Sequence, residues 1–294
     1  MSEVRRTDRA ALAERQRRRR EGQSQRAATV RRRRRLALAA LAGAALLIAL
    51  AGAAAYRHFH RSTPPPVALK TTMVTIPEGL DRQQIAEIAA EAGLRGSYLQ
   101  ASKGREGFLF PDTFEVERHA PASDLVERQL EDFKRRIAGV DMSYARSKNL
   151  TVFDVVTIAS MIEREAQLES QRKLVAAVVY NRLHEGMPLG IDATIRFATG
   201  NYTRPLTESE LAVDSPYNTR TNAGLPPGPI ANPGLASIEA AAHPANVDYR
   251  YYVTEPGTCG KLAFSRTEAE FEADAASYEE AREAAGESPD TCQE

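Results

Sequence analysis

A single run of apolar residues does most to limit what this chain can fold into. The twenty residues from Leu36 to Ala55 contain no charged side chain. At about 1.5 Å per residue, a helix of that length spans roughly 30 Å, which is the thickness of the hydrocarbon core of a bilayer. The run therefore predicts one membrane-spanning helix with polar segments on either side of it.

The charge that precedes this run predicts its orientation. Residues 1–35 carry fourteen Arg and four acidic side chains, and five of the arginines, Arg31 to Arg35, adjoin the span. Positively charged flanks of a span stay in the cytoplasm. We therefore expect a basic cytoplasmic arm at 1–35, a single-pass helix at 36–55 in the plasma membrane, and an extracytoplasmic body.

A signal peptide and a nucleic-acid-binding arm both fit the N-terminal region less well. A cleavable signal peptide has an apolar core of about 7 to 15 residues behind a brief charged segment, whereas this charged segment is long and the apolar run has twenty residues. An Arg-rich arm can also bind nucleic acid. Beside a membrane span it is more simply a topology signal with affinity for anionic lipid, so we expect no nucleic-acid partner.

The body has its own charge and holds both cysteines. After residue 35 the chain carries 25 basic and 35 acidic side chains, a net charge of minus ten, which favours solubility and weighs against a polyanionic ligand. Cys259 and Cys292 both follow the span. In an oxidising compartment they could form a disulfide, and two free thiols are the alternative. Neither has the spacing of a metal site, and we expect no metal or cofactor.

The body begins with a spacer and continues as mixed secondary structure. Residues 56–71 contain three consecutive prolines and predict a semi-rigid linker. From Thr72 the residue pattern predicts a strand over 73–79 and an amphipathic helix over 81–94. Further helices are expected at 122–138, 152–167, 171–184 and 235–242, with a strand at 249–254. Helices and short strands alternate irregularly, so we expect an α+β fold.

The predicted helix at 152–167 carries an acid beside an apolar face. At 100° per residue that face collects Val155, Ile158, Ala159, Ile162 and Ala166. Glu165 projects from its flank. A carboxyl against apolar neighbours loses solvation, so its pKa rises and it can stay protonated to give a proton to a leaving group. A structural pairing of Glu165 with a buried Arg is the alternative.

Several segments taken together resemble one protein family. They are VTIPEG at 74–79, EGFLFPDTF at 106–114, ASMIEREA at 159–166, VVYNRLHEGMPLGIDAT at 178–194 and SPYNTRTNAGLPPGPIANPGLASIEAAAHP at 215–244. In this order they resemble the YceG-like endolytic lytic transglycosylases, the MltG family, over most of residues 72–268. The membrane span agrees with that resemblance.

The resemblance implies an enzyme that cuts peptidoglycan glycan strands at the β-1,4 bond between N-acetylmuramic acid and N-acetylglucosamine, leaving 1,6-anhydro ends. The family's essential acid is the second glutamate of the motif that reads IEREA here, which is Glu165. One carboxyl suffices because the muramyl C6 hydroxyl, and not water, is the nucleophile. The resemblance also implies a truncated LysM-like β-α unit at 72–105, a catalytic domain at 106–274 before an acidic tail at 275–294, and peptidoglycan synthases as partners.

The same motifs supply candidates for contacts to the sugar. They are Asp192, Thr194, Tyr217, Asn218 and Thr219. Each of these could equally be structural, because Asp, Asn and Thr often fix turns by bonding nearby backbone.

Three other polar residues have simpler structural interpretations. Glu106 and Asp112 flank the aromatic segment FLF and are expected to belong to a packed turn. His243 precedes a proline and is expected to end its helix and make a structural hydrogen bond.

The chain departs from the family pattern in two places. Residues 190–194 read GIDAT and lack the polar leader and the proline of many relatives, so substrate contacts there can differ. Residues 261–265 read KLAFS and lack a His that relatives often carry before Phe-Ser. Two rivals to a lytic transglycosylase stay open. One is a glycan-binding scaffold of the cell-wall machinery without turnover, and the other is a hydrolase that uses water and a second carboxylate.

Overall fold

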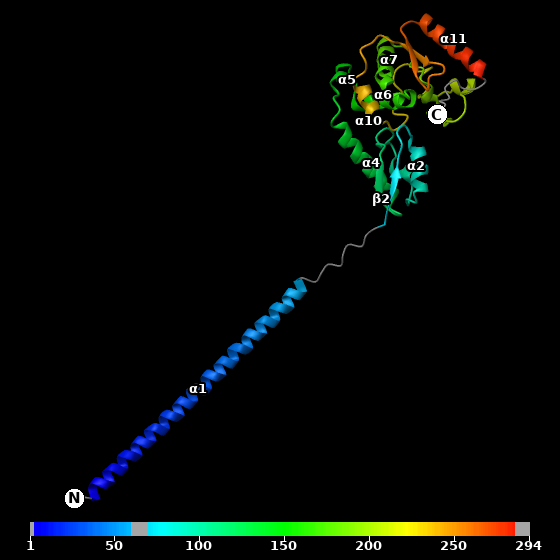
Figure 1. The fold of residues 1–294 in the computed structure, drawn as a ribbon. Helices are drawn as coiled ribbons and strands as arrows, with labels where there is room; N and C mark the ends of the chain where they lie inside the picture. Colours follow the sequence, from blue (N-terminus) through cyan, green and yellow to red (C-terminus); the bar gives the residue numbers. More distant parts are fainter. Residues whose placement is uncertain (1–2, 60–69, 286–294) are drawn as a thin grey trace. The chain divides into compact units, whose positions relative to one another are not determined.

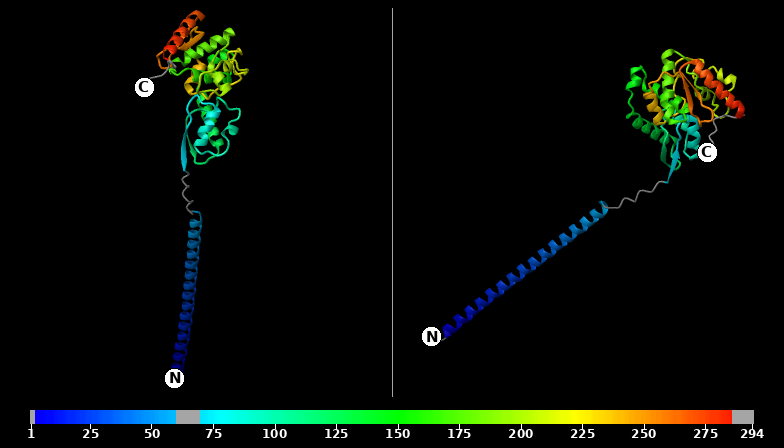
Figure 2. Two further views of the ribbon diagram at one scale, coloured as in Figure 1. Left: turned by 90° about the vertical axis from the view of Figure 1, so that its right-hand side faces the viewer. Right: turned by 45° about the horizontal axis from the view of Figure 1, so that its top comes forward.

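The structure is a computed structural model that describes residues 3–59 and 70–285. The chain divides into two units, residues 1–68 and residues 69–294. Figures 1 and 2 draw the helices and strands of both units.

Within its described residues 3–59, the first unit is one helix, α1 (Glu3–Phe59). Its stretch Arg31–Phe59 is long and apolar enough to cross a membrane, and every side chain of that stretch is exposed. Leu46 and Ile48 keep 62% and 73% of their surface exposed. A helix that is apolar all round and buries no face against protein suits a lipid environment. The expected apolar helix is therefore present, and its orientation stays a prediction.

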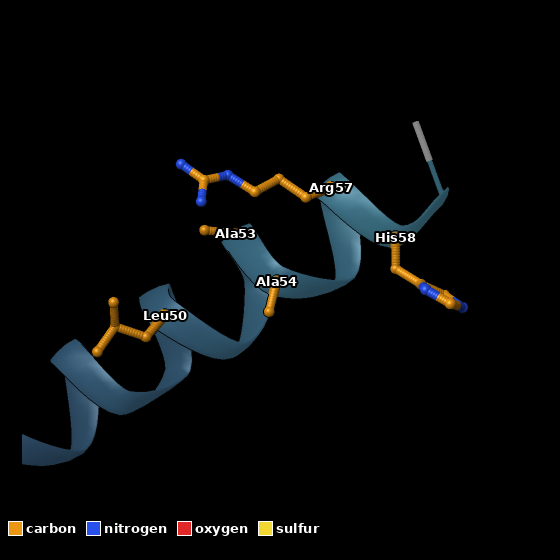
Figure 3. Close-up of a pocket in the computed structure, with 5 residues that line it drawn as sticks. All are labelled: Leu50, Ala53, Ala54, Arg57 and His58. Atoms are coloured by element: carbon orange, nitrogen blue, oxygen red, sulfur yellow. The ribbon is translucent and has the colours of Figure 1, made fainter. Parts of the chain in front are cut away.

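The apolar stretch of α1 is followed by basic side chains in the last turn of the helix. Figure 3 shows Leu50, Ala53 and Ala54 on the last turns of the helix, followed by Arg57 and His58. Basic side chains in a last turn suit both the negative end of the helix dipole and a headgroup layer. These five residues line a hollow on the surface of α1. None of the five has the carboxyl side chain that an acid-base site would need. Most of the expected linker at 56–71 lies outside the described residues.

The second unit mixes helices with short strands, which confirms the α+β prediction. In chain order its elements are β1 (Thr71–Thr75), α2 (Arg82–Glu91), α3 (Tyr98–Ala101), β2 (Thr113–Glu117), α4 (Ala122–Ile137), α5 (Ser143–Ser147), α6 (Val152–Glu165), the 3-10 helix η1 (Glu169–Gln171), α7 (Arg172–Glu185), α8 (Asp192–Thr199), α9 (Glu208–Leu211), α10 (Leu235–Ala242), β3 (Tyr251–Thr254), β4 (Leu262–Ser265) and α11 (Glu268–Ala285). Within residues 70–285, the strands form two antiparallel pairs, β1 with β2 and β3 with β4.

The strand expected at 73–79 overlaps β1 but ends four residues later than β1 does, and the sequence pattern does not predict its partner β2. The two strands pair from Thr71 opposite Glu117 to Thr75 opposite Thr113. Behind them lies a small core that includes Val74, Ile76, Ile85, Leu109, Phe114, Val116 and Leu125. A single strand cannot bury an apolar face by itself, so this small core needs β2. The ladder and the core therefore join residues on both sides of the boundary expected between 105 and 106.

The larger core surrounds α6. The helix begins with a capping box in which Thr151 and Asp154 satisfy each other's backbone N–H groups. Every residue from Val155 to Ile162 is buried, because α7, α8 and α10 pack around the helix. The five residues expected on one apolar face are all buried, and burial extends around the whole helix from Val155 to Ile162. Its first two residues, Val152 and Phe153, are each 44% exposed, and its last three residues are partly exposed.

The C-terminal hairpin of β3 and β4 is tied to the start of α7. The Gln171 side-chain amide donates to the carbonyl oxygen of Leu262 at 2.8 Å, and the Leu262 N–H donates to Gln171 Oε1 at 2.9 Å. α11 packs against both strands of the hairpin. This helix continues across the boundary expected at 274/275. Cys292 lies outside the described residues, so its disulfide with Cys259 stays a prediction.

Candidate active site

Glu165 is the last residue of α6. The buried turns of the helix hold its backbone, and Ala166 then leaves the helix with extended dihedral angles, φ −93° and ψ 99°. The Glu165 side chain is partly exposed, unlike the apolar residues one and two turns before it. The helix thus delivers a carboxyl from a rigid core to an accessible position.

Two elements distant in sequence hold the two oxygens of this carboxyl. The Tyr252 hydroxyl on β3 donates to Glu165 Oε2 at 3.0 Å. The Ala193 backbone N–H, in the first turn of α8, donates to Glu165 Oε1 at 3.4 Å. Sequence pattern does not identify Tyr252, because 87 residues separate it from Glu165.

The surroundings of Glu165 favour its neutral form. Burial raises the pKa of the Glu165 carboxyl, and the charge of Asp192 raises it further, while the bonds from Tyr252 and Ala193 and the charge of Arg196 act in the opposite direction. Among the residues that the structure describes, no Lys, Arg or His side chain forms an ion pair with Glu165. Within the described residues, Glu165 therefore does not pair with a buried Arg, which was the alternative expectation.

Glu163, the other glutamate of the same motif, does have such a partner. Its Oε1 lies 3.2 Å from a guanidinium nitrogen of Arg172, and both side chains are largely buried, with 6% and 13% exposed. Its Oε2 accepts the N–H of Gly234, the residue that caps α10, at 3.0 Å. Glu163 therefore joins α6 to α7 and to the start of α10, whereas Glu165 is the glutamate of this motif with a raised pKa.

Thr194 and Thr219 come together at the turn that begins α8. Their hydroxyl oxygens lie 3.0 Å apart, and both side chains are buried. Thr194 Oγ1 donates to the carbonyl oxygen of Ile191 at 2.6 Å, and the Ile191 N–H donates to Thr219 Oγ1 at 2.9 Å. These bonds hold the turn that starts α8. Their contact with a sugar stays a prediction.

Asn218 and Tyr217 differ in exposure. Asn218 is buried, and its side-chain amide donates to the carbonyl oxygens of Leu211 and Val213, each at 3.0 Å. Tyr217 is partly exposed and packs its ring 4.9 Å from that of Phe197, centroid to centroid. A partly exposed aromatic face of this kind can stack on a sugar ring, whereas the Asn218 amide is already occupied.

Asp192, the first residue of α8, has a charged partner. Its Oδ1 accepts bonds from Arg220 Nη2 at 2.7 Å and from Nε at 3.0 Å. About half of each side chain is exposed. The pair lies close enough to Glu165 for the Asp192 charge to affect the pKa of the Glu165 carboxyl.

The structure supports the packed-turn interpretation of residues 106–112. Phe110 is buried in the core, and Asp112 pairs with Arg136 at 3.0 Å. Glu106 accepts bonds from the Asn232 amide at 2.8 Å and from the Arg82 N–H at 3.1 Å. Burial raises the pKa of Glu106 to about 7. Sequence reasoning missed this perturbed carboxyl, because the partners that bury it come from distant segments.

His243 ends α10, as expected. Its backbone N–H donates to the Glu239 carbonyl, and its Nε2 lies 3.2 Å from Asp141 Oδ2. Within residues 3–59 and 70–285, no three His, Cys, Asp or Glu side chains are grouped so that they could hold a metal ion.

The fold and site together define a class of domain, an α+β domain in which the last residue of the central helix is a carboxyl of raised pKa. A crystal structure of a YceG-like protein from Listeria monocytogenes has a similar fold, with a TM-score of 0.63 and 31% sequence identity over 68% of this chain and 75% of that one. A model of the YceG-like family matches residues 50–277. The chain belongs to the YceG-like family, as its sequence segments predict.

Relatives with described activity match part of the chain. One is an endolytic murein transglycosylase of Bacillus subtilis, 38% identical over 169 residues, which covers 55% of this chain and 44% of the relative. Another is an endolytic murein transglycosylase of Streptococcus pneumoniae, 33% identical over 178 residues, which covers 59% of this chain and 32% of the relative. The chain therefore spans less than half the length of these relatives.

Proposed function

We propose that this protein is a membrane-anchored endolytic lytic transglycosylase. It cleaves the β-1,4 bond between N-acetylmuramic acid and N-acetylglucosamine in nascent peptidoglycan and leaves 1,6-anhydro ends. The observation that carries the proposal is the environment of Glu165, a partly exposed residue whose carboxyl pKa is raised by burial. Membership of the YceG-like family and the names of its relatives support the same activity.

The reaction needs one group that acts first as an acid and then as a base. Protonated Glu165 gives its proton to the glycosidic oxygen as the bond from C1 to that oxygen breaks. The muramyl C6 hydroxyl oxygen then bonds to C1, and the Glu165 carboxylate takes the hydroxyl proton. Glu165 returns to its starting state, and no water is consumed. A raised pKa serves the first half of this cycle, and the hydrogen bonds of Tyr252 and Ala193 to the carboxylate serve the second.

The remaining parts of the proposal concern place and partners. We propose that α1 anchors the chain with its Arg-rich end in the cytoplasm, which puts Glu165 on the side of the membrane where peptidoglycan lies. Cutting of nascent strands there would set their length or release them, and peptidoglycan synthases are the natural partners. The large basic excess of residues 1–35 supports the orientation.

One observation favours a second candidate, a hydrolase. Asp192 is a second carboxylate whose charge acts on Glu165, and a pair of carboxylates is what a water-using glycosidase needs. The Asp192 carboxylate is engaged by Arg220 through two hydrogen bonds, which weighs against its use as a base or nucleophile. The lytic reaction is therefore the better-supported candidate.

Mass spectrometry of the products decides between these functions. The full chain in detergent is incubated with uncrosslinked glycan strands, beside Glu165→Gln and the control Glu169→Gln, which changes an exposed carboxyl in η1. We expect anhydromuramyl ends, one water lighter than hydrolysed ends, from wild type and Glu169→Gln but not from Glu165→Gln. Hydrolysed ends would identify a hydrolase, and no cleavage by wild type would identify a scaffold.

A further inference from the structure

The hairpin that carries Tyr252 is fixed in place from two sides. β4 is tied to the start of α7 by the paired bonds between Gln171 and Leu262. On its other side, the ring of Tyr251 stacks on Phe271 of α11 with centroids 5.3 Å apart. β3 also contacts α7 directly. The hairpin is therefore a firm support for any group that it presents to the site.

Tyr252 is suited to be a permanent hydrogen-bond donor. Its ring packs against Phe264 of the paired strand, with centroids 6.0 Å apart. Burial, and then the negative charge of Glu165, raise the pKa of the Tyr252 hydroxyl well above its usual range. The hydroxyl therefore keeps its proton, and that proton is directed to Glu165 Oε2.

The two oxygens of Glu165 are consequently unequal. Oε2 accepts a bond from a hydroxyl at 3.0 Å, whereas Oε1 accepts only a long bond of 3.4 Å from the Ala193 N–H. In a protonated carboxyl, the carbonyl oxygen is the better acceptor, so the stronger donor holds the oxygen that it contacts in the carbonyl form. The transferable proton then belongs on Oε1.

We propose that Tyr252 is a positioning residue that keeps Glu165 Oε2 as an acceptor and confines the transferred proton to Oε1. This inference rests on the proposed function of Glu165 and deepens it. The same oxygen then gives the proton to the glycosidic oxygen and takes the proton of the C6 hydroxyl. Both substrate oxygens must therefore approach Oε1, beside the first turn of α8.

Other charged groups surround Glu165 and Tyr252, and a test of the inference must leave these groups unchanged. Asp192 and Arg196 act on the Glu165 carboxyl from α8, and Arg182 acts on Tyr252 from α7. None of them is altered when the Tyr252 hydroxyl alone is removed. The variant Tyr252→Phe keeps the ring and its contact with Phe264, and the variant Tyr251→Phe is a matched control on the adjacent residue of the same strand.

The first measurement does not depend on activity. The full chain, labelled with ¹³C at Glu side-chain carboxyls, is titrated by NMR, with Glu165→Gln used to assign the Glu165 resonance. A hydrogen bond to the ionised form lowers the pKa of a carboxyl, so its loss raises that pKa. We expect the Glu165 pKa to rise by about one unit in Tyr252→Phe, a tenfold change in proton affinity, and to stay unchanged in Tyr251→Phe.

The second measurement is the pH profile of strand cleavage by the same variants. We expect kcat of Tyr252→Phe to fall about tenfold or more with KM within about twofold, and its alkaline limb to move to higher pH. An unchanged Glu165 pKa in Tyr252→Phe would overturn the inference, as would equal losses of activity and of melting temperature in both variants. Absence of anhydro ends with wild type would overturn the proposed function, and the titration would still decide the role of Tyr252.

Discussion

The Glu163 carboxylate lies 3.2 Å from the Arg172 guanidinium, while Glu165, two residues further along the same helix end, has no ion pair within the described part of the chain. One motif thus supplies two carboxyls with opposite environments. The first joins three helices, and the second has a pKa that burial raises.

This contrast predicts unequal effects of two matched substitutions on stability. Glu163→Gln removes the nearer of two carboxylates beside Arg172 and leaves Glu78 at 3.7 Å, so we expect the free energy of unfolding to fall by about 2 kcal/mol. Glu165→Gln removes a carboxyl that burial disfavours, so we expect stability to change by less than about 1 kcal/mol. Urea unfolding of the two variants beside wild type measures both values. If instead Glu163→Gln is as stable as wild type but inactive, the assignment of the acid to Glu165 is wrong.

The raised pKa of Glu106 predicts that the stability of the fold depends on pH. Its folded-state pKa is raised from 4.5 to about 7, so the folded state binds the proton more tightly than the unfolded state does. The contribution of protonated Glu106 is complete below about pH 4.5 and is lost as pH rises through about 7, a change of about 3 kcal/mol. Glu106→Gln has no such titration. We therefore expect the stability of wild type relative to Glu106→Gln to fall by that amount between pH 4.5 and 8 in urea unfolding. A constant difference would show that Glu106 titrates normally.

Gly107 packs so closely against Pro229 and Val156 that a larger side chain should not fit at this position. It has φ +83°, and a Cβ at this position would contact Pro229 too closely and lie 2.9 Å from Val156 Cγ1. We expect Gly107→Ala to lower the free energy of unfolding by about 3 kcal/mol or more, because neither neighbour can move freely. The control is Gly104→Ala, where φ is +69° and no atom lies within 4 Å of the added Cβ. The control measures the backbone cost alone, about 1 kcal/mol. Equal losses in the two variants would contradict the packing argument.

Local pattern was enough to predict the parts of the molecule that depend on neighbours in sequence. The apolar run of α1, the helix that carries Glu165 and the strand around Tyr252 all follow from patterns over adjacent residues. β2 was not predicted, although its five residues alternate between exposed and buried positions. The helical wheel showed one apolar face of α6 because it contains no information on how many helices surround it.

The partners of the site residues lay beyond the reach of local pattern. Tyr252 reaches Glu165 across 87 residues, and the Asn232 amide reaches Glu106 across 126. Each contact exists only after the chain has folded, so neither the hydroxyl donor of the acid nor the raised pKa of Glu106 could be derived from spacing. The family resemblance identified Glu165 but carried no information on the group that orients it.

Thr219 provides a test that separates a structural role from a role in binding sugar. Its hydroxyl accepts the Ile191 N–H and lies 3.0 Å from Thr194 Oγ1. Thr219→Val keeps the shape and leaves a buried N–H without its partner, so we expect a loss of about 1 to 3 kcal/mol in stability. Thr221→Val, at an exposed threonine two residues later, is the control and should change stability by less than about 0.5 kcal/mol. A raised KM at unchanged stability would instead identify Thr219 as a sugar contact.

Substitution of Asp192 tests whether a second carboxylate takes part in the chemistry. Its charge raises the pKa of Glu165, so Asp192→Asn lowers that pKa. The protonated acid then disappears at lower pH, and we expect the alkaline limb of the cleavage profile to move to lower pH while the products keep their anhydro ends. Asp214→Asn, at an exposed carboxyl in the loop before the PYNT segment, should leave the profile unchanged. The measurement is mass spectrometry of products across the pH range. Complete loss of cleavage by a stably folded Asp192→Asn, together with hydrolysed ends from wild type, would mean that Asp192 activates water and that the enzyme is a hydrolase.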